Sequence, residues 1–128
     1  MGRYYYGDIE GKFMFAVQPS DAGERFGAYE TPQEPSSIDY AVSRDSYDKL
    51  SKELKEIELS GAVARVEHMW EELEKEGQHG YNMEKDCARF NVTPNDLSEY
   101  ADWRMGKQMK DYFDKNPEAE SLWFNAEL

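Results

Sequence analysis

The 128-residue sequence is poor in the side chains that most often carry catalysis or bind metals. It contains one cysteine, Cys87, and two histidines, His68 and His79. A single cysteine excludes an internal disulfide, and this predicts a reducing, cytoplasmic environment. A structural zinc site takes about four cysteine or histidine ligands, and the two histidines show no metal-binding spacing. We therefore expect neither a metal nor another cofactor.

Long apolar runs and excess positive charge are also lacking. No run approaches the roughly 18 apolar residues of a membrane-spanning helix, so we expect no membrane insertion. The chain has 15 basic and 27 acidic side chains and a net charge of −12. This charge argues against direct binding to nucleic acid or to an anionic membrane, and it favours a partner with a basic surface. The acidic excess is spread along the chain: 7 acidic against 3 basic residues in 1–42, then 10 against 6 in both 43–78 and 79–128.

No nucleophile with a partner base is evident in the sequence, and the prediction is that the protein is not an enzyme. The serines show no Gly-x-Ser-x-Gly elbow. Two interpretations of Cys87 are open: a nucleophile paired in space with His79, or a half-buried helix residue, which is favoured. Asp8 and Glu10 are the best-placed pair of carboxylates, although a solvated turn is the favoured explanation of both.

Aromatic residues are abundant at the start of the chain, where Tyr4, Tyr5 and Tyr6 are consecutive. Gly7 and Gly11 flank a turn, so a β-hairpin is predicted from strands at about 3–6 and 12–18. Proline 19 ends the second strand. The following Ser20–Gly27 segment predicts a helical turn, with Ser20 as the N-cap and Gly27 as the terminator.

The middle of the chain predicts one strand and then helices. The segment 38–42 alternates as a strand does. Apolar stripes with helical spacing predict helices at about 44–58 and 62–76, with Ser43 as the first cap and Gly77 as the last terminator. The break at Ser60–Gly61 between two matching stripes suggests an antiparallel helical hairpin.

A short helix is predicted from Asn82 to about Phe90, and a long helix starts at Thr93-Pro94 and runs to about Lys115. The apolar C-terminal segment 122–128 predicts a final strand that docks on the N-terminal hairpin.

These elements predict an α+β fold: a small antiparallel sheet, formed by the N-terminal β-hairpin and the C-terminal strand, packed with a three- to four-helix subdomain. We expect a single domain covering residues 1–128, with a β-rich part at 1–42, a helical part at 43–115 and the strand at 122–128.

Both ends of the chain resemble a family of small uncharacterised proteins common in phage genomes. The resemblance rests on Arg3–Gln18, Ser20–Ala22, Phe26–Gly27 and Phe124–Leu128, and it does not extend to the middle helices. It implies a phage accessory protein in the cytoplasm of an infected host cell. Small acidic phage proteins often inhibit host machinery, so the resemblance favours an inhibitor of a host defence system, either anti-CRISPR-like or another anti-defence protein. The acidic charge suits one that mimics nucleic acid.

The opening hairpin is the first candidate binding surface, because phenol rings supply apolar area with a hydrogen-bonding tip. Tyr4 and Tyr6 are expected on one face of the first strand, beside Arg3 or Arg25, whereas plain core packing is the alternative. The complete candidate set is Tyr4, Tyr6, Arg3, Arg25, Asp8 and Glu10.

The second candidate surface is acidic and consists of Glu67, Glu71, Glu72 and Glu74. The alternative interpretation is that these residues form only the solvent-exposed face of a helix. The predicted function is non-catalytic binding to a host protein, with two alternatives: sequestration of a small nucleotide signal by tyrosines with Arg3, Arg25 and Lys12, or a structural or housekeeping phage role. The oligomeric state is open, a homodimer included.

Overall fold

The computed structural model describes residues 3–14, 18–30, 37–77 and 83–127. Across these residues the chain forms a five-stranded sheet in the order β2-β1-β5-β4-β3, and every neighbouring pair is antiparallel. The strands are β1 (Tyr4–Gly7), β2 (Gly11–Lys12), β3 (Tyr29–Glu30), β4 (Ser37–Ser43) and β5 (Ser121–Glu127). The predicted α+β class is therefore confirmed.

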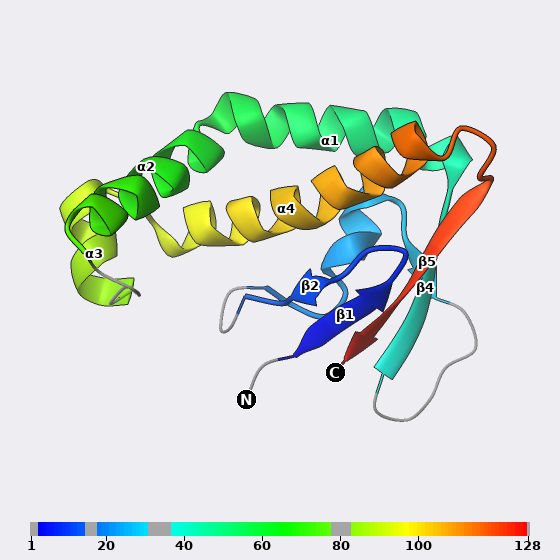
Figure 1. The fold of residues 1–128 in the computed structure, drawn as a ribbon, viewed down its shortest axis with the longest axis horizontal. Coiled ribbons are helices and arrows are strands. Elements are labelled where there is room, and N and C mark those ends of the chain that lie inside the picture. The colour runs from blue at the N-terminus through cyan, green and yellow to red at the C-terminus, as the bar shows by residue number, and fades with distance from the viewer. Residues whose placement is uncertain (1–2, 15–17, 31–36, 78–82, 128) are drawn as a thin grey trace.

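The described helices lie on one face of this sheet and extend beyond it as an arm (Figure 1). They are the 3-10 helices η1 (Ala22–Phe26) and η2 (Arg44–Ser46) and the α-helices α1 (Tyr47–Ser60), α2 (Ala62–Lys75), α3 (Met83–Phe90) and α4 (Pro94–Lys115). Helix α4 is the central helix of the arm, because α1 and α2 both pack along it.

The predicted antiparallel hairpin of α1 and α2 is wrong. Only Gly61 separates these helices, with a left-handed φ of +86°. One residue bends the chain at this point but does not reverse it, since helical hairpins need a loop of two to five residues. In Figure 1, α2 continues from α1 along a bent line, and α4 runs back beneath both helices.

The C-terminal strand docks on β1 as predicted, and it occupies the centre of the sheet. On one side β5 pairs with β1, where Tyr6 lies opposite Asn125, and on the other side it pairs with β4 along its whole length. Its alternate residues Leu122, Phe124 and Ala126 are buried against the helices. These side chains join Tyr5, Phe26, Leu50, Met105 and other residues in one hydrophobic cluster.

The second predicted strand is much shorter than expected. The β1–β2 ladder ends at Lys12, and the Gln18 backbone N–H donates to the Met14 carbonyl oxygen at 2.9 Å. An extended strand over 12–18 would keep Met14 and Gln18 far apart, so this part of the prediction is wrong. Residues 15–17 of this segment lie outside the described part of the chain.

Ser20 has a different role from the predicted helix cap. Helix η1 begins at Ala22, and its N-cap residue Asp21 makes no side-chain capping bond. The Ser20 hydroxyl instead donates to the Glu127 carbonyl oxygen at 2.7 Å, so it fastens this segment to the end of β5. The predicted terminator, Gly27, does end the helix, with φ of +98°.

The start of α4 follows the prediction and is reinforced by an ion pair. Thr93 and Asp96 form a reciprocal capping box, which stabilises a helix start. Asp96 is only 5% exposed, and its two carboxylate oxygens accept from the Arg65 guanidinium of α2 at 3.0 and 2.7 Å. The Arg65 guanidinium holds the pKa of the Asp96 carboxyl below its usual range, and Thr93 lowers it further.

Asp96→Asn is expected to lower the free energy of unfolding by about 1–2 kcal/mol at pH 7, because it removes the charge from both interactions. The wild-type carboxyl has a lower pKa in the folded state than in the unfolded state. Its contribution is therefore present above pH ~4 and is lost as pH falls through the folded pKa. Urea unfolding at pH 7 and pH 3 measures the gap in the free energy of unfolding between the wild type and Asp96→Asn, and this gap should be smaller at pH 3. The control Asp111→Asn removes a long contact to Lys107 of 3.9 Å and should cost less than about 0.5 kcal/mol. A gap that is the same at both pH values would contradict the prediction.

Candidate functional site: the open face of the sheet

The sheet face opposite the helices carries a set of exposed aromatic side chains. Side chains alternate between the two faces of a strand, so the burial of Tyr5, Tyr40 and Phe124 on the helical side directs their neighbours to the other face. The exposed aromatic residues of this open face are Tyr4 at 49%, Tyr6 at 53%, Tyr29 at 52% and Trp123 at 49%. They come from three different strands.

The strand register places three of these rings next to one another. Tyr4 and Tyr6 are two residues apart on β1, and Tyr6 lies opposite Asn125 of β5. Trp123 is therefore a diagonal neighbour of Tyr6, at the spacing of about 7–8 Å over which aromatic side chains still interact.

A small residue separates Trp123 from the fourth ring. Ala41 of β4 lies opposite Trp123 on one side and opposite Tyr29 of β3 on the other. Two interstrand spacings, about 9.5 Å, thus lie between the strands that carry the two rings. Alanine fills little of this interval, so no large side chain of β4 stands between Trp123 and Tyr29.

Polar groups at the centre of the face are held in place by hydrogen bonds. Asn125 is 6% exposed, and its amide nitrogen donates to Ser37 Oγ at 2.9 Å and to Asp39 Oδ1 at 2.8 Å. The amide orients both partners, so the Asp39 carboxylate has a defined position beside the Tyr6–Asn125 pair.

Two more carboxylates flank the aromatic rings at the β1–β5 junction. The Asp8 carboxylate accepts from the Trp123 backbone N–H at 2.9 Å, and the Glu127 carboxylate accepts from the Tyr4 backbone N–H at 2.8 Å. Each of them extends the pairing of the two strands. Each also places negative charge beside an exposed ring, as Asp39 does beside Tyr6.

A shallow hollow borders the face at its β2 edge, lined by Tyr4, Tyr6, Glu10, Gly11 and Lys12 among others. The Lys12 ammonium lies 6.0 Å from the centre of the Tyr4 ring, within the range of a cation–π contact. Of the three cations expected beside the tyrosines, Lys12 is the one that the structure places there.

The other two cations, Arg3 and Arg25, lie on the helical side, so their expected position beside Tyr4 and Tyr6 is wrong. The Arg3 guanidinium lies 5.2 Å from the centre of the buried Phe13 ring and donates to the Gln18 carbonyl oxygen and to Ser20. Strand alternation puts residue 3 on the same face as Tyr5, which explains this position.

Arg25 connects η1 to the two helices above it. Its guanidinium contacts Glu53 of α1 at 3.0 Å and Glu99 and Asp102 of α4 at 2.8 and 3.1 Å. Burial raises the pKa of Asp102, although Arg25 and Gln18 act to lower it. Three carboxylates around one guanidinium make Arg25 a structural cross-link.

The candidate carboxylate pair Asp8 and Glu10 is divided between two neighbours. Asp8 contacts β5, as described above, whereas the Glu10 backbone N–H donates to the Gln108 side chain of α4 at 3.0 Å. Ile9 between them is buried. The turn thus connects the sheet to the long helix, and Asp8 is the member that borders the aromatic face.

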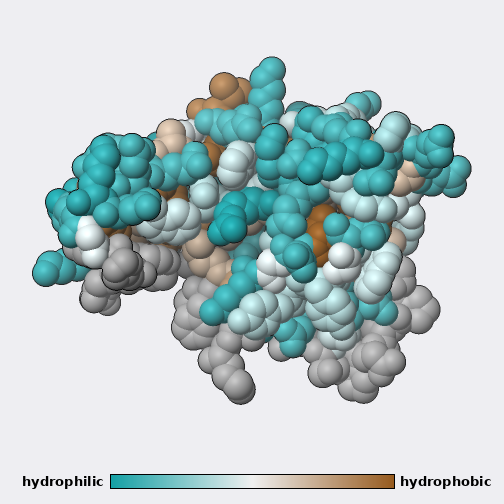
Figure 2. All heavy atoms as spheres, viewed as in Figure 1, coloured by the Kyte–Doolittle hydropathy of each residue, from teal (hydrophilic) through white to brown (hydrophobic). Residues whose placement is uncertain are grey.

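The predicted acidic surface is part of the hydrophilic exterior of the helical arm, which Figure 2 shows over α1, α2 and α3. Glu67, Glu71 and Glu74 are exposed on α2. Glu71 and Glu72 lie 3.6 and 3.4 Å from the Lys75 ammonium, so part of this acidic charge is paired within the helix.

Among the described residues, the candidate cysteine and histidine side chains are not arranged for catalysis or metal binding. Burial raises the pKa of the Cys87 thiol, and the carboxylates of Asp86 and Asp96 raise it further, which disfavours a reactive thiolate. His68 packs edge-to-face on Phe90 at 6.0 Å, while His79 lies outside the described chain. Among the residues that the structure describes, no three or more His, Cys, Asp or Glu side chains form a group that could hold a metal ion.

Trp123 and Tyr29 complete the aromatic face, and the sequence reasoning missed both. The docked C-terminal strand predicts Trp123 in the core with Phe124, which is wrong, because Trp123 is 49% exposed. Tyr29 belongs to a strand that the sequence does not predict. The alternation in Leu122-Trp123-Phe124 carried a usable signal, because a strand that docks through Leu122 and Phe124 must turn Trp123 to the other side.

Comparison with protein-family models, with curated proteins and with solved structures finds no match for this chain. None of the helices among the described residues combines the length and apolar character that crossing a bilayer requires.

Proposed function

We propose that this protein acts without catalysis by binding a basic segment of a partner protein on the open face of its sheet. The observation that carries the proposal is the combination of four half-exposed aromatic rings, Tyr4, Tyr6, Tyr29 and Trp123, with carboxylates on one sheet face. Exposed clusters of large rings mark interaction sites more often than isolated exposed residues do.

The chemistry of the face suits arginine and lysine side chains. An arginine guanidinium stacks on tryptophan or tyrosine rings and also pairs with carboxylates. Asp8, Asp39 and Glu127 supply that charge at the edges of the rings.

A nucleic acid ligand fits this face less well. Sheets that bind single-stranded nucleic acid combine stacking rings with a positively charged groove that follows the phosphates. Among the described residues, Lys12 lies beside the rings and Lys115 shares a hollow with Asp8, against the three carboxylates. The charge balance therefore supports a protein partner that is itself basic, such as the nucleic-acid-binding surface of a larger protein.

In biological terms, we propose that the protein occupies such a basic surface and inhibits the partner. The resemblance of both chain ends to phage proteins supports a host defence protein as the target. The geometry of the open face supports binding of a basic surface, and mutations on this face test that binding directly.

Tyr6→Ala combined with Trp123→Ala is expected to abolish binding of a basic peptide while the fold is retained. The two rings are neighbours at the centre of the face, and loss of two contact-centre aromatic residues should weaken binding about 100-fold or more. The probe is a synthetic peptide that alternates arginine with threonine, titrated into labelled protein and followed by NMR. The wild-type shifts should lie on β1, β4 and β5, and a peptide with glutamate in place of arginine should not bind.

The control variant carries Glu67→Gln, Glu71→Gln and Glu74→Gln on α2. It changes more charge than the double aromatic variant but leaves the sheet face intact, so it should bind the peptide nearly as the wild type does. If the α2 variant loses binding and the aromatic variant retains it, the acidic helix is the binding surface and the proposal fails. Self-association through the sheet face that excludes the peptide would identify a second copy as the occupant, and would also overturn the proposal.

Ionic strength gives a further check on the same complex. Long-range attraction is screened beyond about 8 Å at physiological salt, so the association rate should fall as salt rises. The stacking contacts should persist, and the dissociation rate should change much less than the association rate.

A further inference from the structure

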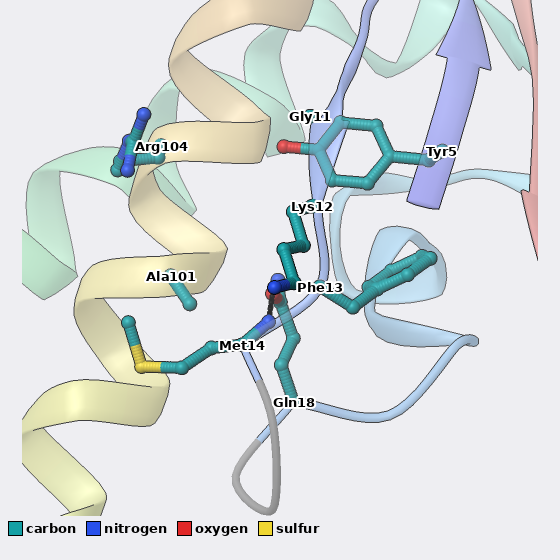
Figure 3. Close-up of a pocket in the computed structure, with 8 residues that line it drawn as sticks. All are labelled: Tyr5, Gly11, Lys12, Phe13, Met14, Gln18, Ala101 and Arg104. Carbon is teal, nitrogen blue, oxygen red and sulfur yellow. Dashed lines mark hydrogen bonds between the residues drawn. The ribbon is translucent and has the colours of Figure 1, made fainter. Parts of the chain in front are cut away.

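A pocket on the opposite side of the sheet lies at the inner corner between the hairpin and helix α4. Its volume is about 310 Å³, within the range of small-molecule sites. Figure 3 shows Tyr5 and Phe13 on the hairpin side of the pocket and Ala101 and Arg104 on the helix side. Tyr5 points to the side opposite Tyr4 and Tyr6, so the pocket lies on the helical side of the hairpin, although Gly11 and Lys12 also line the hollow at the β2 edge of the open face.

The lining of the pocket differs in charge from the rest of the molecule. None of the described residues that line it is an aspartate or a glutamate, whereas Lys12 and Arg104 both contribute to it. The whole chain has 27 acidic against 15 basic side chains, so a wall without carboxylates and with two cations attracts an anion locally.

The Arg104 guanidinium is available for such an anion. Most arginines of the protein are engaged, as the contacts of Arg25 with three carboxylates and of Arg65 with Asp96 illustrate. Within the described part of the chain, Arg104 makes no ion pair, and its side chain is exposed at the mouth of the pocket.

Tyr5 adds a buried hydroxyl with an unused proton. The residue is 4% exposed, and its oxygen accepts a long hydrogen bond of 3.4 Å from the Gln108 amide. Among the described residues, no acceptor is in place for the hydroxyl proton, and in Figure 3 the hydroxyl points toward α4. The hydroxyl lines the pocket, so its proton can be donated to an acceptor oxygen of a ligand there.

From this geometry we propose that the pocket binds a small aromatic monophosphate, the chemical class of a mononucleotide. Arg104 and the Tyr5 hydroxyl supply donors for the terminal oxygens of a phosphate. Lys12, whose ammonium lies beside Tyr4, adds positive charge at the rim. Phe13, Met14 and Ala101 supply apolar surface for a flat ring. Lys12 also borders the open face, so Arg104 and the Tyr5 hydroxyl are the groups whose removal tests this pocket separately from the partner proposed there.

The test is a calorimetric and NMR titration of the full chain with AMP, GMP, CMP and UMP. At least one should bind saturably at millimolar concentration or below, with shifts at Tyr5 and Ala101. Adenosine and inorganic phosphate serve as probes of the ring alone and of the anion alone, and both should bind more weakly. Arg104→Gln should weaken the binding by about 10-fold or more, as expected for a lost charge-assisted hydrogen bond.

Tyr5→Phe is the second variant, because it keeps the ring in the core and removes the hydroxyl alone. Lys107→Gln is the matched control: it removes one positive charge from the same helix but lies outside the pocket lining, and its affinity should equal that of the wild type. Absence of saturable binding for all four nucleotides would overturn the proposal. Undiminished binding in a folded Tyr5→Phe, Arg104→Gln double variant would overturn it equally.

Discussion

A chain truncated after Ser121 is expected to show no cooperative unfolding transition. The deletion removes the central strand β5 and with it the pairing partners of both β1 and β4. It also removes the buried side chains of Leu122, Phe124 and Ala126. Each lost large side chain costs about 3 kcal/mol, and a domain of this size has only about 5–15 kcal/mol in total.

A single substitution tests the same point without shortening the chain. Phe124 is fully buried, stacks on Tyr40 with ring centres 5.4 Å apart and meets Tyr5 edge-to-face at 6.2 Å. Phe124→Ala should lower the free energy of unfolding by about 3–5 kcal/mol. The neighbouring Trp123→Ala, on the open face, is the matched control and should cost much less. Circular dichroism during thermal and urea unfolding measures both, and equal losses at the two positions would contradict the assigned faces.

Gly106→Ala in helix α4 is expected to destabilise the protein by about 1–3 kcal/mol. In most helix interiors this change stabilises, because alanine has the better helix propensity by about 1 kcal/mol. Here a Cβ on Gly106 would lie 2.7 Å from Phe26 Cε1 and 2.9 Å from Leu54 Cδ2. These side chains are buried, so they cannot move away without disturbing the core, and overpacking outweighs propensity.

Two further variants separate the effect of overpacking on stability from the effect of backbone conformation. Gly77→Ala has no atom within 4 Å of the new Cβ, so its cost arises from the left-handed φ of +79° alone and should be about 1 kcal/mol. Phe26→Leu combined with Gly106→Ala should be more stable than the sum of the single changes predicts, because the smaller side chain relieves the contact. If Gly106→Ala raises the melting temperature, the close packing of η1 on α4 is wrong.

Local signals in the sequence were sufficient for most elements of the arm. The capping box at Thr93 and Asp96 and the terminating Gly77 depend on backbone groups a few residues away, so they act in the same way in any fold. The alternation within residues 38–42 and 122–128 predicted strands β4 and β5 for the same reason. The predicted strand over 12–18 failed because its apolar residues fit a strand pattern, whereas a turn between Met14 and Gln18 ends the ladder.

The sequence by itself therefore determined the helices, their buried stripes, the α+β class and the docking of an apolar C-terminal strand. The tertiary structure alone decided that β5 is central, that Trp123 and Tyr29 share a face with Tyr4 and Tyr6, and that Arg25 is enclosed by three carboxylates while Arg104 borders a pocket. The reason is physical: a helix cap or a strand alternation is set by neighbours within a few residues, while strand order and charge pairing join residues up to more than a hundred positions apart, as Tyr5 and Ala126 show. Such pairings form only when the whole core is assembled.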